Sequence, residues 1–536
     1  MKYRNILALL SIYGLTSLAA EETLHETSFE SQKHGAIESF QDANTTWTSK
    51  GRSEITKKYS KTGQQSLRIF GGEDNSIEIT LNEKLQSLRG LSFSAERWTR
   101  KAPFKFRIEA MVNGNWQEVS KLDNLIAVGG KFDSQIVIKL PDEIISGLRF
   151  KCTAPDTAGI LIDDLKFLKG EPENVTKIPA IATEPVRNIL EQKDIWISGE
   201  ENTHTFRIPA IITAMNGDLI AATDARRKNS ADLKWVNDID IVIKRSTDNG
   251  KTWTATETVI DYGGESVAKP ASDASFILDR TTGEIFCFYN FMDQKKAKGV
   301  FRLHLQSSKD HGKTWSKPRD LTDEISTPDS INDFKFITSG RGIQTRDGEL
   351  LHTLVNLKHG VYLFGSKDHG KTWYFKKTPV KPADESKVAE LNDGTLMINS
   401  RVGKGSRYVH SSSDKGVTWS TIKDTNLVDP RCNAAFIRYT SVKDGYKKNR
   451  LLFCNASSFS GRRNLAIRIS YDEGKTWTDG KVIDAGPSAY SSLTICKDGS
   501  IAVLYEPGYK AIRFARFTLE DLTDGKDKLS QPYKIQ

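Results

Sequence analysis

Five copies of one short pattern, Ser-x-Asp-x-Gly-x-Thr-Trp, constrain the fold of this chain more than any other feature of its sequence. We call this pattern the Asp box. The first copy runs from Ser246 to Trp253, and the later copies end at Trp315, Trp373, Trp419 and Trp477. One copy could arise by chance, but five copies at similar intervals indicate a structural unit that is repeated along the chain.

Each Asp box is predicted to form the turn of a β-hairpin. Strand-like runs with alternating apolar and polar residues precede the boxes, for example at 238–243 and 301–305. In the turn, Asp can accept a hydrogen bond from the backbone two residues on, Gly can adopt a positive φ, and Trp can fold back as an apolar plug over the blade. A turn uses all of these residues, whereas catalysis would not need five copies. The functional site is therefore expected elsewhere.

The spacing of the boxes predicts the number of repeats. The box tryptophans lie about 56 residues apart on average, and 59 residues follow the last of them. Residues 191–536 therefore accommodate six units, the last without a recognisable box. We predict an all-β fold in which this region is a six-bladed β-propeller, a closed ring that protects the edges of its sheets. Loops from all blades then meet at one axial mouth, where the site is expected.

The first twenty residues, 1–20, have the features of a secretory signal peptide. Lys2 and Arg4 precede an apolar stretch, and small residues, Ala19 and Ala20 among them, surround a cleavage point. The mature protein is therefore expected to be secreted, into the periplasm or the extracellular medium. No later stretch approaches the ~20 apolar residues of a membrane helix, so the chain is not expected to span a membrane.

Residues 21–170 differ in pattern from the propeller region and favour a β-sandwich. Short strand-like runs occur at 66–70 and 104–110, Asn113-Gly114 is typical of a hairpin turn, and 159–167 reads as a closing strand. The all-β propeller is therefore expected to be preceded by a separate, jelly-roll-like domain.

This first domain resembles the jelly-roll carbohydrate-binding modules that are attached to secreted glycosidases. Trp47, Trp98 and Trp116 could stack on sugar rings in such a module, or could pack in the core or in turns. The segment 171–190 contains three prolines and is predicted to be an extended linker.

Cysteine content and charge limit the other functions. Five cysteines in 536 residues, with no Cys-x-x-Cys pair, favour neither a disulfide framework nor a zinc site. The formal net charge of +9 is a small excess over 68 acidic residues, so nucleic acid is not an expected partner. The excess could attract an acidic glycan or mucin, or could simply keep the surface soluble.

Three arginines lie at strand ends or in loops of different predicted blades. Arg207 opens a strand-like stretch in Phe206-Arg-Ile-Pro209, Arg401 ends another, and Arg462 lies in a small polar loop. Each of them alone could be a solvated surface charge. Together they could converge at the axis, where a planar guanidinium is the best bidentate partner for a carboxylate. The ligand suggested by this arrangement carries a carboxylate.

Phe206-Arg-Ile-Pro209 followed by several Asp boxes strongly resembles the exo-sialidases (neuraminidases) of the bacterial type, and the resemblance extends over 191–536. It implies that Arg207, Arg401 and Arg462 grip the carboxylate of sialic acid. Arg463 competes with Arg462 for the third role, and Arg462 is preferred because it directly follows the loop glycine.

The resemblance also assigns the catalytic residues. Tyr490, in a Ser-rich segment after the last box, matches the family's nucleophile. Glu385 matches the carboxylate that assists it, with Glu390 as the rival. Asp232, in a polar loop before the first box, matches the general acid.

Further positions follow from the same resemblance. Glu506 matches the carboxylate that orients Arg207, while Arg226 and Asp273 match residues that line the pocket for ring hydroxyl and acylamino groups. Asp238 and Asp240 also precede the first box, but they alternate into a strand and are interpreted as structural.

The implied protein is a secreted exo-α-sialidase that uses no metal or organic cofactor. Its partners would be sialylated glycoproteins, mucins, glycolipids or oligosaccharides. Two related enzymes, a trans-sialidase and an intramolecular trans-sialidase, would use the same residues. A propeller that only binds glycans is the alternative from a different class.

Overall fold

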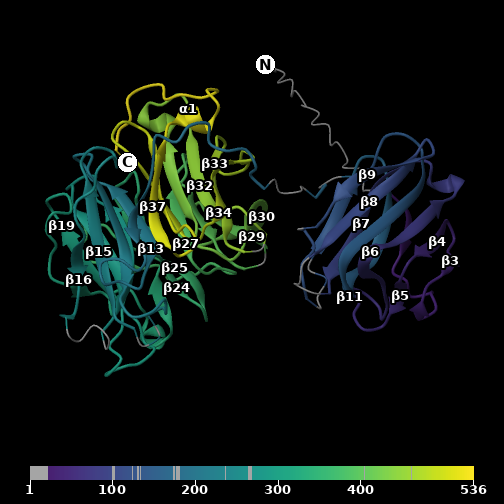
Figure 1. Ribbon diagram of the computed structural model, residues 1–536, viewed down its shortest axis with the longest axis horizontal. Coiled ribbons are helices and arrows are strands. Elements are labelled where there is room, and N and C mark those ends of the chain that lie inside the picture. Colours follow the sequence, from purple (N-terminus) through teal and green to yellow (C-terminus); the bar gives the residue numbers. More distant parts are fainter. Residues whose placement is uncertain are drawn as a thin grey trace, which may run out of the picture. The chain divides into compact units, whose positions relative to one another are not determined.

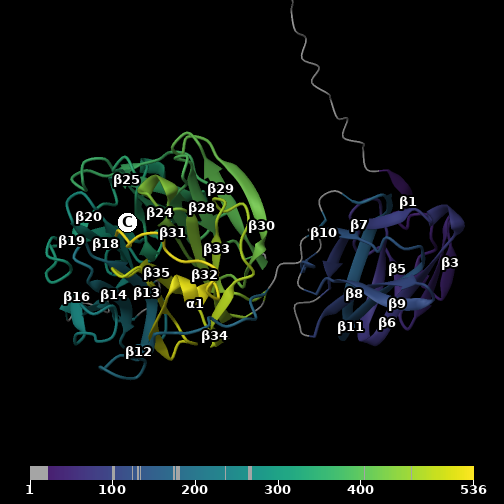
Figure 2. The same ribbon diagram turned by 90° about the horizontal axis from the view of Figure 1, so that it is seen from above.

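In the computed structural model the chain divides into two compact units, 1–178 and 179–536 (Figures 1 and 2). The structure describes residues 22–535 except for 99–102, 124, 130, 131, 133, 173, 174, 177–180, 234, 236, 264–268, 404 and 460. The expected signal peptide lies outside the described residues, as does part of the expected linker. No helix among the described residues is long and apolar enough to cross a membrane.

The first unit is a β-sandwich, as the sequence predicts. Its strands are β1 (Thr23–Thr27), β2 (Gly35–Ala36), β3 (Ser39–Gln41), β4 (Thr45–Lys50), β5 (Ser53–Thr56), β6 (Ser66–Leu81), β7 (Leu88–Arg97), β8 (Lys105–Val112), β9 (Asn115–Lys121), β10 (Ser134–Lys139) and β11 (Ile145–Lys169). The long strand β11 pairs with β8 and β6 in its first half and with β7, β6 and β1 in its second half. It therefore joins the strands that enclose one apolar core.

The three tryptophans of this unit are packed by other side chains. Trp47 is fully buried in the core, with an exposed fraction of 0%. The guanidinium of Arg68 lies 3.8 Å from the ring centre of Trp98, and that of Arg149 lies 4.3 Å from a ring centre of Trp116. For Trp47 the core interpretation is therefore correct, because a buried ring cannot stack on a sugar.

The second unit is a propeller of six antiparallel blades (Figure 2). From the axis outward, the first blade consists of β13 (Thr205–Thr213), β14 (Leu219–Arg226), β15 (Ile239–Ser246) and β16 (Glu257–Ile260), and the second of β17 (Ala271–Leu278), β18 (Ile285–Phe291), β19 (Arg302–Ser308) and β20 (Arg319–Asp320). The third consists of β21 (Lys335–Ile337) with β23 (Ile343–Gln344), then β24 (Leu350–Asn356), β25 (Gly360–Ser366) and β26 (Tyr374–Phe375), and the fourth of β27 (Ser386–Glu390), β28 (Leu396–Ser400), β29 (Gly405–Ser412) and β30 (Ser420–Asp429). The fifth consists of β31 (Ala435–Thr440), β32 (Arg450–Ala456), β33 (Arg463–Ser470) and β34 (Lys481–Pro487), and the sixth of β35 (Ser491–Ile495), β36 (Ile501–Tyr505), β37 (Ala511–Phe517) and β12 (Glu191–Ile197). The short strand β22 (Gly340–Arg341) adds to β17 in parallel, and α1 (Leu519–Leu522) follows the last blade.

The first strand of the propeller closes the ring. β12 pairs antiparallel with β37, so that Glu191 lies opposite Arg516 and Ile197 lies opposite Ala511. Strands from both ends of the second unit thus share the sixth blade. The prediction of six blades is confirmed, and the last blade has no Asp box.

The five Asp boxes are the turns between the third and fourth strands of the first five blades, and they share one hydrogen-bond pattern. In the first box, Ser246 Oγ donates to Asp248 Oδ1 at 2.8 Å and accepts from the Gly250 N–H at 2.8 Å. Asp248 Oδ1 also accepts from the Thr252 N–H at 2.9 Å. The aspartate therefore binds the backbone four residues on, and not two residues on as expected, because the Ser hydroxyl binds the nearer Gly250 N–H.

The box tryptophans pack between blades. The ring of Trp253, from the first blade, lies 5.2 Å from that of Phe514 in the sixth blade. The ring of Trp373, from the third blade, lies 5.1 Å from that of Phe288 in the second. Other box tryptophans contact their own blade, as expected, since the ring of Trp477 lies 5.8 Å from that of Phe453 in the fifth blade. For Trp253 and Trp373 the expectation was incomplete, because their rings also contact the preceding blade.

The segment before β12 packs on the propeller. The Val186 N–H donates to the Val482 C=O at 2.9 Å, and the Leu190 N–H donates to the Arg516 C=O at 2.8 Å. Val186 is buried in the apolar cluster of the fifth and sixth blades. Residues of the expected linker thus contribute to the second unit.

Two shortened chains test where the propeller begins. A chain that starts at residue 181 is expected to fold with the stability of the second unit. A chain that starts at residue 191 should lose about 2 kcal/mol of unfolding free energy, because it lacks the buried Val186. Urea unfolding of both chains measures the difference. Equal unfolding free energies would mean that residues 181–190 do not stabilise the propeller. Insolubility of the longer chain would mean that the propeller needs the first unit.

Candidate active site

The Asp boxes and the predicted site residues lie at opposite ends of the blades. In the first blade, Leu219 pairs with Ser246 of the box, whereas Arg226 pairs with Ile239 at the other end. The inner strands begin at this other end, and the second strands finish there. Arg207, Glu385, Arg401, Arg462, Tyr490 and Glu506 all lie where an inner strand begins, a second strand finishes or a third strand begins. The chain therefore brings them to one axial mouth.

Tyr490 and Glu385 form a hydrogen-bonded pair in this mouth. Tyr490 Oη donates to Glu385 Oε1 at 2.6 Å, and the Tyr490 side chain is buried. Arg401 Nη1 donates to Tyr490 Oη at 2.9 Å and also contacts Glu385 Oε2. Glu390 lies at the far end of β27 and accepts from the Arg346 N–H. The structure thus places Glu385, and not Glu390, against the phenol.

The pKa of Tyr490 is raised well above its ordinary value. Burial is the largest cause, and the nearby negative charge of Glu385 raises this pKa further. The positive charges of Arg401 and Arg462 act in the opposite direction. The phenol is therefore neutral at pH 7, and it can become a nucleophile only if a base such as Glu385 takes its proton.

Glu506 holds the first arginine. Arg207 Nε donates to Glu506 Oε1 at 2.6 Å, and the Ile208 N–H donates to the same oxygen at 2.8 Å. Glu506 Oε2 accepts from the Tyr490 N–H at 3.1 Å, and its side chain is fully buried. Burial opposes the charge on Arg207, but the Glu506 carboxylate raises the pKa of this guanidinium above its ordinary value. One carboxylate thus fixes both Arg207 and the backbone of Tyr490.

The backbone is strained next to Arg207. Ile208 has φ of +66°, a left-handed conformation that a β-branched residue rarely adopts. The strand register shifts between Arg207 and Ala210 at the same place. Such a conformation costs on the order of 1–3 kcal/mol and persists only where the surroundings hold it. The hydrogen bond from the Ile208 N–H to Glu506 stabilises this conformation, which directs Arg207 toward the mouth.

All three predicted arginines surround the ring of Tyr490. The guanidinium carbons of Arg207 and Arg462 lie 5.4 and 5.2 Å from its ring centre, and Arg401 bonds to its hydroxyl. Arg462 Nη1 also donates to Tyr509 Oη at 3.0 Å. Arg463 is exposed at the start of β33. The structure therefore brings Arg462, and not Arg463, into the cluster.

Tyr509 is a residue of this mouth that the sequence analysis missed. Its ring centre lies 4.4 Å from the guanidinium carbon of Arg207, and its hydroxyl accepts from Arg462. Tyr509 has φ of +66°, another left-handed backbone. The sequence signal for a turn at this place was the preceding residue, Gly508, because glycine favours a positive φ, which Gly508 has.

Asp232 lies on the loop between β14 and β15. Its side chain is 66% exposed, and its Oδ1 accepts from Arg226 Nη1 at 2.6 Å. Arg226 is buried and also donates to the Ser230 C=O at 2.8 Å. Asp240, by contrast, is buried and accepts from Arg227 Nε at 2.9 Å. Of these two carboxylates, only that of Asp232 is accessible to a bound molecule.

An acidic pair, the buried Asp224 and the half-buried Asp273, lies beside Arg226. Asp224 Oδ1 accepts from the Asp273 N–H at 2.9 Å, and Asp224 Oδ2 pairs with Arg226 at 3.3 Å. Burial raises the pKa of Asp224 to about 6. Burial, and then the charge of Asp224, raise the pKa of Asp273 well above its ordinary value. The charged form of Asp273 is therefore disfavoured, and its side chain offers polar atoms to a bound molecule. The sequence signal for Asp224 was its position two residues before Arg226, because residues two apart in a strand lie on the same face of the sheet.

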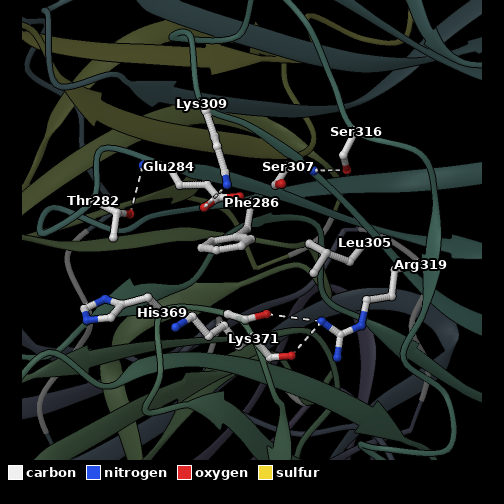
Figure 3. A pocket seen from close by; sticks show the side chains of 11 residues that line it. Thr282, Glu284, Phe286, Leu305, Ser307, Lys309, Ser316, Arg319, His369 and Lys371 are labelled. Atoms are coloured by element: carbon white, nitrogen blue, oxygen red, sulfur yellow. Dashed lines mark hydrogen bonds and ion pairs between the residues drawn. The ribbon is translucent and has the colours of Figure 1, made fainter.

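A separate hollow of the propeller lies away from this mouth. A cavity of about 610 Å³ lies near the Asp boxes of the second and third blades, lined by Phe286, Lys309, Arg319 and His369 among others. Figure 3 shows Arg319 directed at the backbone oxygens of the neighbouring box. The cavity contains none of the predicted site residues. It offers no paired nucleophile and base.

The described residues hold no group of three or more His, Cys, Asp and Glu side chains that could bind a metal ion. All five cysteines are buried and free. Burial raises the pKa of Cys432, which lies near Tyr490, to about 12, so its thiol is protonated at neutral pH.

Comparisons with known proteins relate the chain to sialidases. A family model described as "BNR repeat-like domain" matches 217–503, more than half of the chain. A sialidase of Micromonospora viridifaciens is 35% identical over 368 residues, which cover 63% of this chain and 56% of that protein. A sialidase of Bacteroides fragilis is 30% identical over 353 residues, covering 61% and 64%. This chain thus spans less than two thirds of either relative.

A solved structure supports the fold. The structure of a Hadza microbial sialidase matches with a TM-score of 0.56 and 21% sequence identity. The match covers 87% of this chain and 98% of that chain.

Proposed function

Because the chain belongs to the sialidase family of BNR repeat-like propellers, we propose that it is a retaining exo-α-sialidase, which releases terminal sialic acid from glycoconjugates. The hydrogen bond of 2.6 Å between Tyr490 and Glu385, with three guanidinium groups around the same phenol, carries the proposal. A protein that only binds glycans has no use for a buried tyrosine whose proton is directed at a carboxylate.

The arginines provide the site for the substrate carboxylate. A guanidinium binds a carboxylate with two parallel hydrogen bonds, and three of them select a sugar that carries its own negative charge. Arg207, Arg401 and Arg462 are the three groups in this proposal. Arg226 and Asp273 would contact ring hydroxyl and acylamino groups on the opposite wall.

A tyrosine nucleophile suits this substrate. Most retaining glycosidases use a carboxylate, and sialidases are a known exception. The anomeric carbon of sialic acid bears a carboxylate, so an attacking carboxylate would meet a like charge. At 4 Å and an effective dielectric of ~20 this repulsion is about 4 kcal/mol. A neutral phenol such as Tyr490 avoids it, and Glu385 is within reach to accept the proton.

The reaction then has two displacements. In the first, Tyr490 Oη bonds to the anomeric carbon and gives its proton to Glu385, while Asp232 protonates the departing glycosidic oxygen. In the second, water attacks the same carbon and gives a proton to Asp232, while Glu385 returns its proton to the leaving Tyr490 Oη. Two inversions at one carbon give net retention. Asp232 bonds to Arg226 here, and its exposed loop position would allow it to reach the glycoside.

Proton NMR of the products tests this reaction against its alternatives. Sialyllactose isomers should yield α-sialic acid first, before mutarotation. An anhydro sugar as the product would indicate an intramolecular trans-sialidase, and transfer to an added galactoside would indicate a trans-sialidase. No product from any isomer would support a propeller that only binds glycans. We further propose that the protein is secreted and acts on sialylated glycoproteins, mucins, glycolipids or oligosaccharides.

Arg462 and its neighbour form a matched pair for testing the clamp. Arg462→Lys keeps the charge but loses the planar fork, and loss of a charge-assisted hydrogen bond costs ~1.5–3 kcal/mol, so KM should rise roughly tenfold to a hundredfold. Arg463→Lys should change KM little, because Arg463 is exposed. Steady-state kinetics on a sialoside measures both. A larger effect at Arg463 would show that the wrong neighbour was assigned.

A further inference from the structure

A second cavity lies on the central axis at the Asp-box end of the propeller, opposite to the candidate active site. Four arginines from the inner strands line it. Arg280 follows β17, Arg341 belongs to β22, Arg346 follows β23 and Arg438 belongs to β31. The cavity volume is about 70 Å³. Its four guanidinium groups outnumber the two carboxylates of its lining, Glu390 and Asp444, so the cavity is basic.

Two of the four arginines have counter-charges. Arg346 lies 3.8 Å from a Glu390 oxygen and 3.6 Å from an Asp444 oxygen. Arg438 contacts both carboxylate oxygens of Glu473. These two positive charges are therefore compensated by the protein.

The other two arginines have no direct ion pair among the described residues. Burial lowers the pKa of Arg280, and the more distant negative charges of Asp444 and Glu390 act in the opposite direction. Among the described residues, no carboxylate oxygen lies within 4 Å of the Arg280 or Arg341 guanidinium. Arg280 Nε donates to Gln344 Oε1 at 3.1 Å, and its Nη2 donates to the Gln344 C=O at 2.9 Å and the Thr345 C=O at 3.0 Å. All three acceptors are neutral, and Nη1 is the nitrogen left to bind a ligand. Arg341 reaches across to the Leu493 C=O of the sixth blade with one long bond of 3.4 Å, while its Nε is buried without an acceptor.

These two groups also repel each other. Burial lowers the pKa of Arg341 below its ordinary value, and the charge of Arg280 lowers it further. Both guanidinium groups nevertheless remain charged in proteins at neutral pH. Two cations without direct ion pairs at one partly buried cavity are costly unless a further negative charge joins them.

From this geometry we propose that the axial cavity binds a small tetrahedral oxyanion, such as inorganic phosphate or sulfate, between Arg280 and Arg341. Guanidinium N–H groups bind such an anion with charge-assisted hydrogen bonds, and Arg280 Nη1 and the Arg341 guanidinium are the donors in this proposal. One water needs about 10–15 Å³ of cavity volume, so 70 Å³ has room for about five heavy atoms, the number in phosphate.

The bound anion would tie the propeller together at its axis. Arg280 belongs to the second blade, and Arg341 links β22 to the sixth blade through Leu493. The anion would therefore stabilise the closed ring. This inference is independent of the proposed sialidase activity, because the cavity and the candidate active site lie at opposite ends of the inner strands.

Phosphate titration of the full chain tests the site. Calorimetry should detect saturable binding of sodium phosphate, measured against sodium chloride at the same ionic strength. The midpoint of thermal unfolding should rise with phosphate concentration, since a ligand that binds only the folded state stabilises it. Arg341→Met should weaken phosphate binding at least about tenfold, because it removes a charged donor. Arg280→Gln serves as the second variant if Arg341→Met does not fold.

Two control variants locate the anion. Arg462→Met removes a guanidinium from the candidate active site, and Lys371→Met removes a charge from the cavity of Figure 3. Both should bind phosphate at the axial cavity as the unaltered chain does. The proposal is overturned if the unaltered chain shows no saturable phosphate binding. It is also overturned if binding survives in Arg341→Met and Arg280→Gln, or if it is lost in Arg462→Met.

Discussion

Tyr490→Phe is expected to lower kcat by at least about 10³-fold, since loss of a nucleophile that acts with its base removes the covalent route. Binding of free sialic acid should change little, because the three arginines remain in place. The aromatic ring also remains in Tyr490→Phe, so the packing around this side chain is preserved. Steady-state kinetics on an aryl sialoside and calorimetric binding of sialic acid measure the two effects separately.

Tyr509→Phe is the matched control for this change. Tyr509 also lies against Arg207 and Arg462, but it makes no contact with Glu385 in the structure. Its loss should raise KM and leave kcat nearly unchanged. If both variants lose kcat to the same extent, the phenol of Tyr490 has no special role, and disturbance of the arginines explains the loss.

Asp232→Asn is expected to have an effect that depends on the leaving group. Turnover of sialyllactose should fall by ~10²–10⁴, because the departing alkoxide needs a proton in the transition state. Turnover of an activated aryl sialoside should fall much less, since its leaving group is already a stable anion. The ratio of kcat/KM for the two substrates is the quantity to measure.

Asp240→Asn provides the structural comparison. Asp240 is buried and bonded to Arg227, so its replacement should affect both substrates equally, through the fold. An equal loss on both substrates in Asp232→Asn would assign Asp232 a role in structure or binding. The general acid would then have to be sought elsewhere in the mouth.

The propeller could be predicted from the sequence because its signal is local and repeated. Each Asp box uses hydrogen bonds within a few residues, such as those from Ser246 and Thr252 to Asp248, so the turn is specified wherever the pattern occurs. The pairing of β12 with β37 was not predictable in this way. It joins segments from the two ends of the second unit, and neither segment carries an Asp box.

Part of the candidate site was predicted, because some of its residues lie within patterns that can be recognised locally in the sequence. Residues within recognisable patterns, such as Arg207 and Glu506, lie together as expected. Tyr509 and Asp224 were missed because their importance depends on contacts with distant segments. The contact of Trp253 with the sixth blade was also missed, because Trp253 meets Phe514 only when the propeller is closed.

Labelling with a mechanism-based fluorosialyl reagent tests the central claim most directly. Such a reagent traps the covalent intermediate, because fluorine slows its hydrolysis more than its formation. Peptide mass spectrometry after digestion then locates the attached sugar. We expect one adduct, on Tyr490, and none in Tyr490→Phe. An adduct on Glu385, Asp232 or any other residue of the unaltered chain would contradict a tyrosine nucleophile.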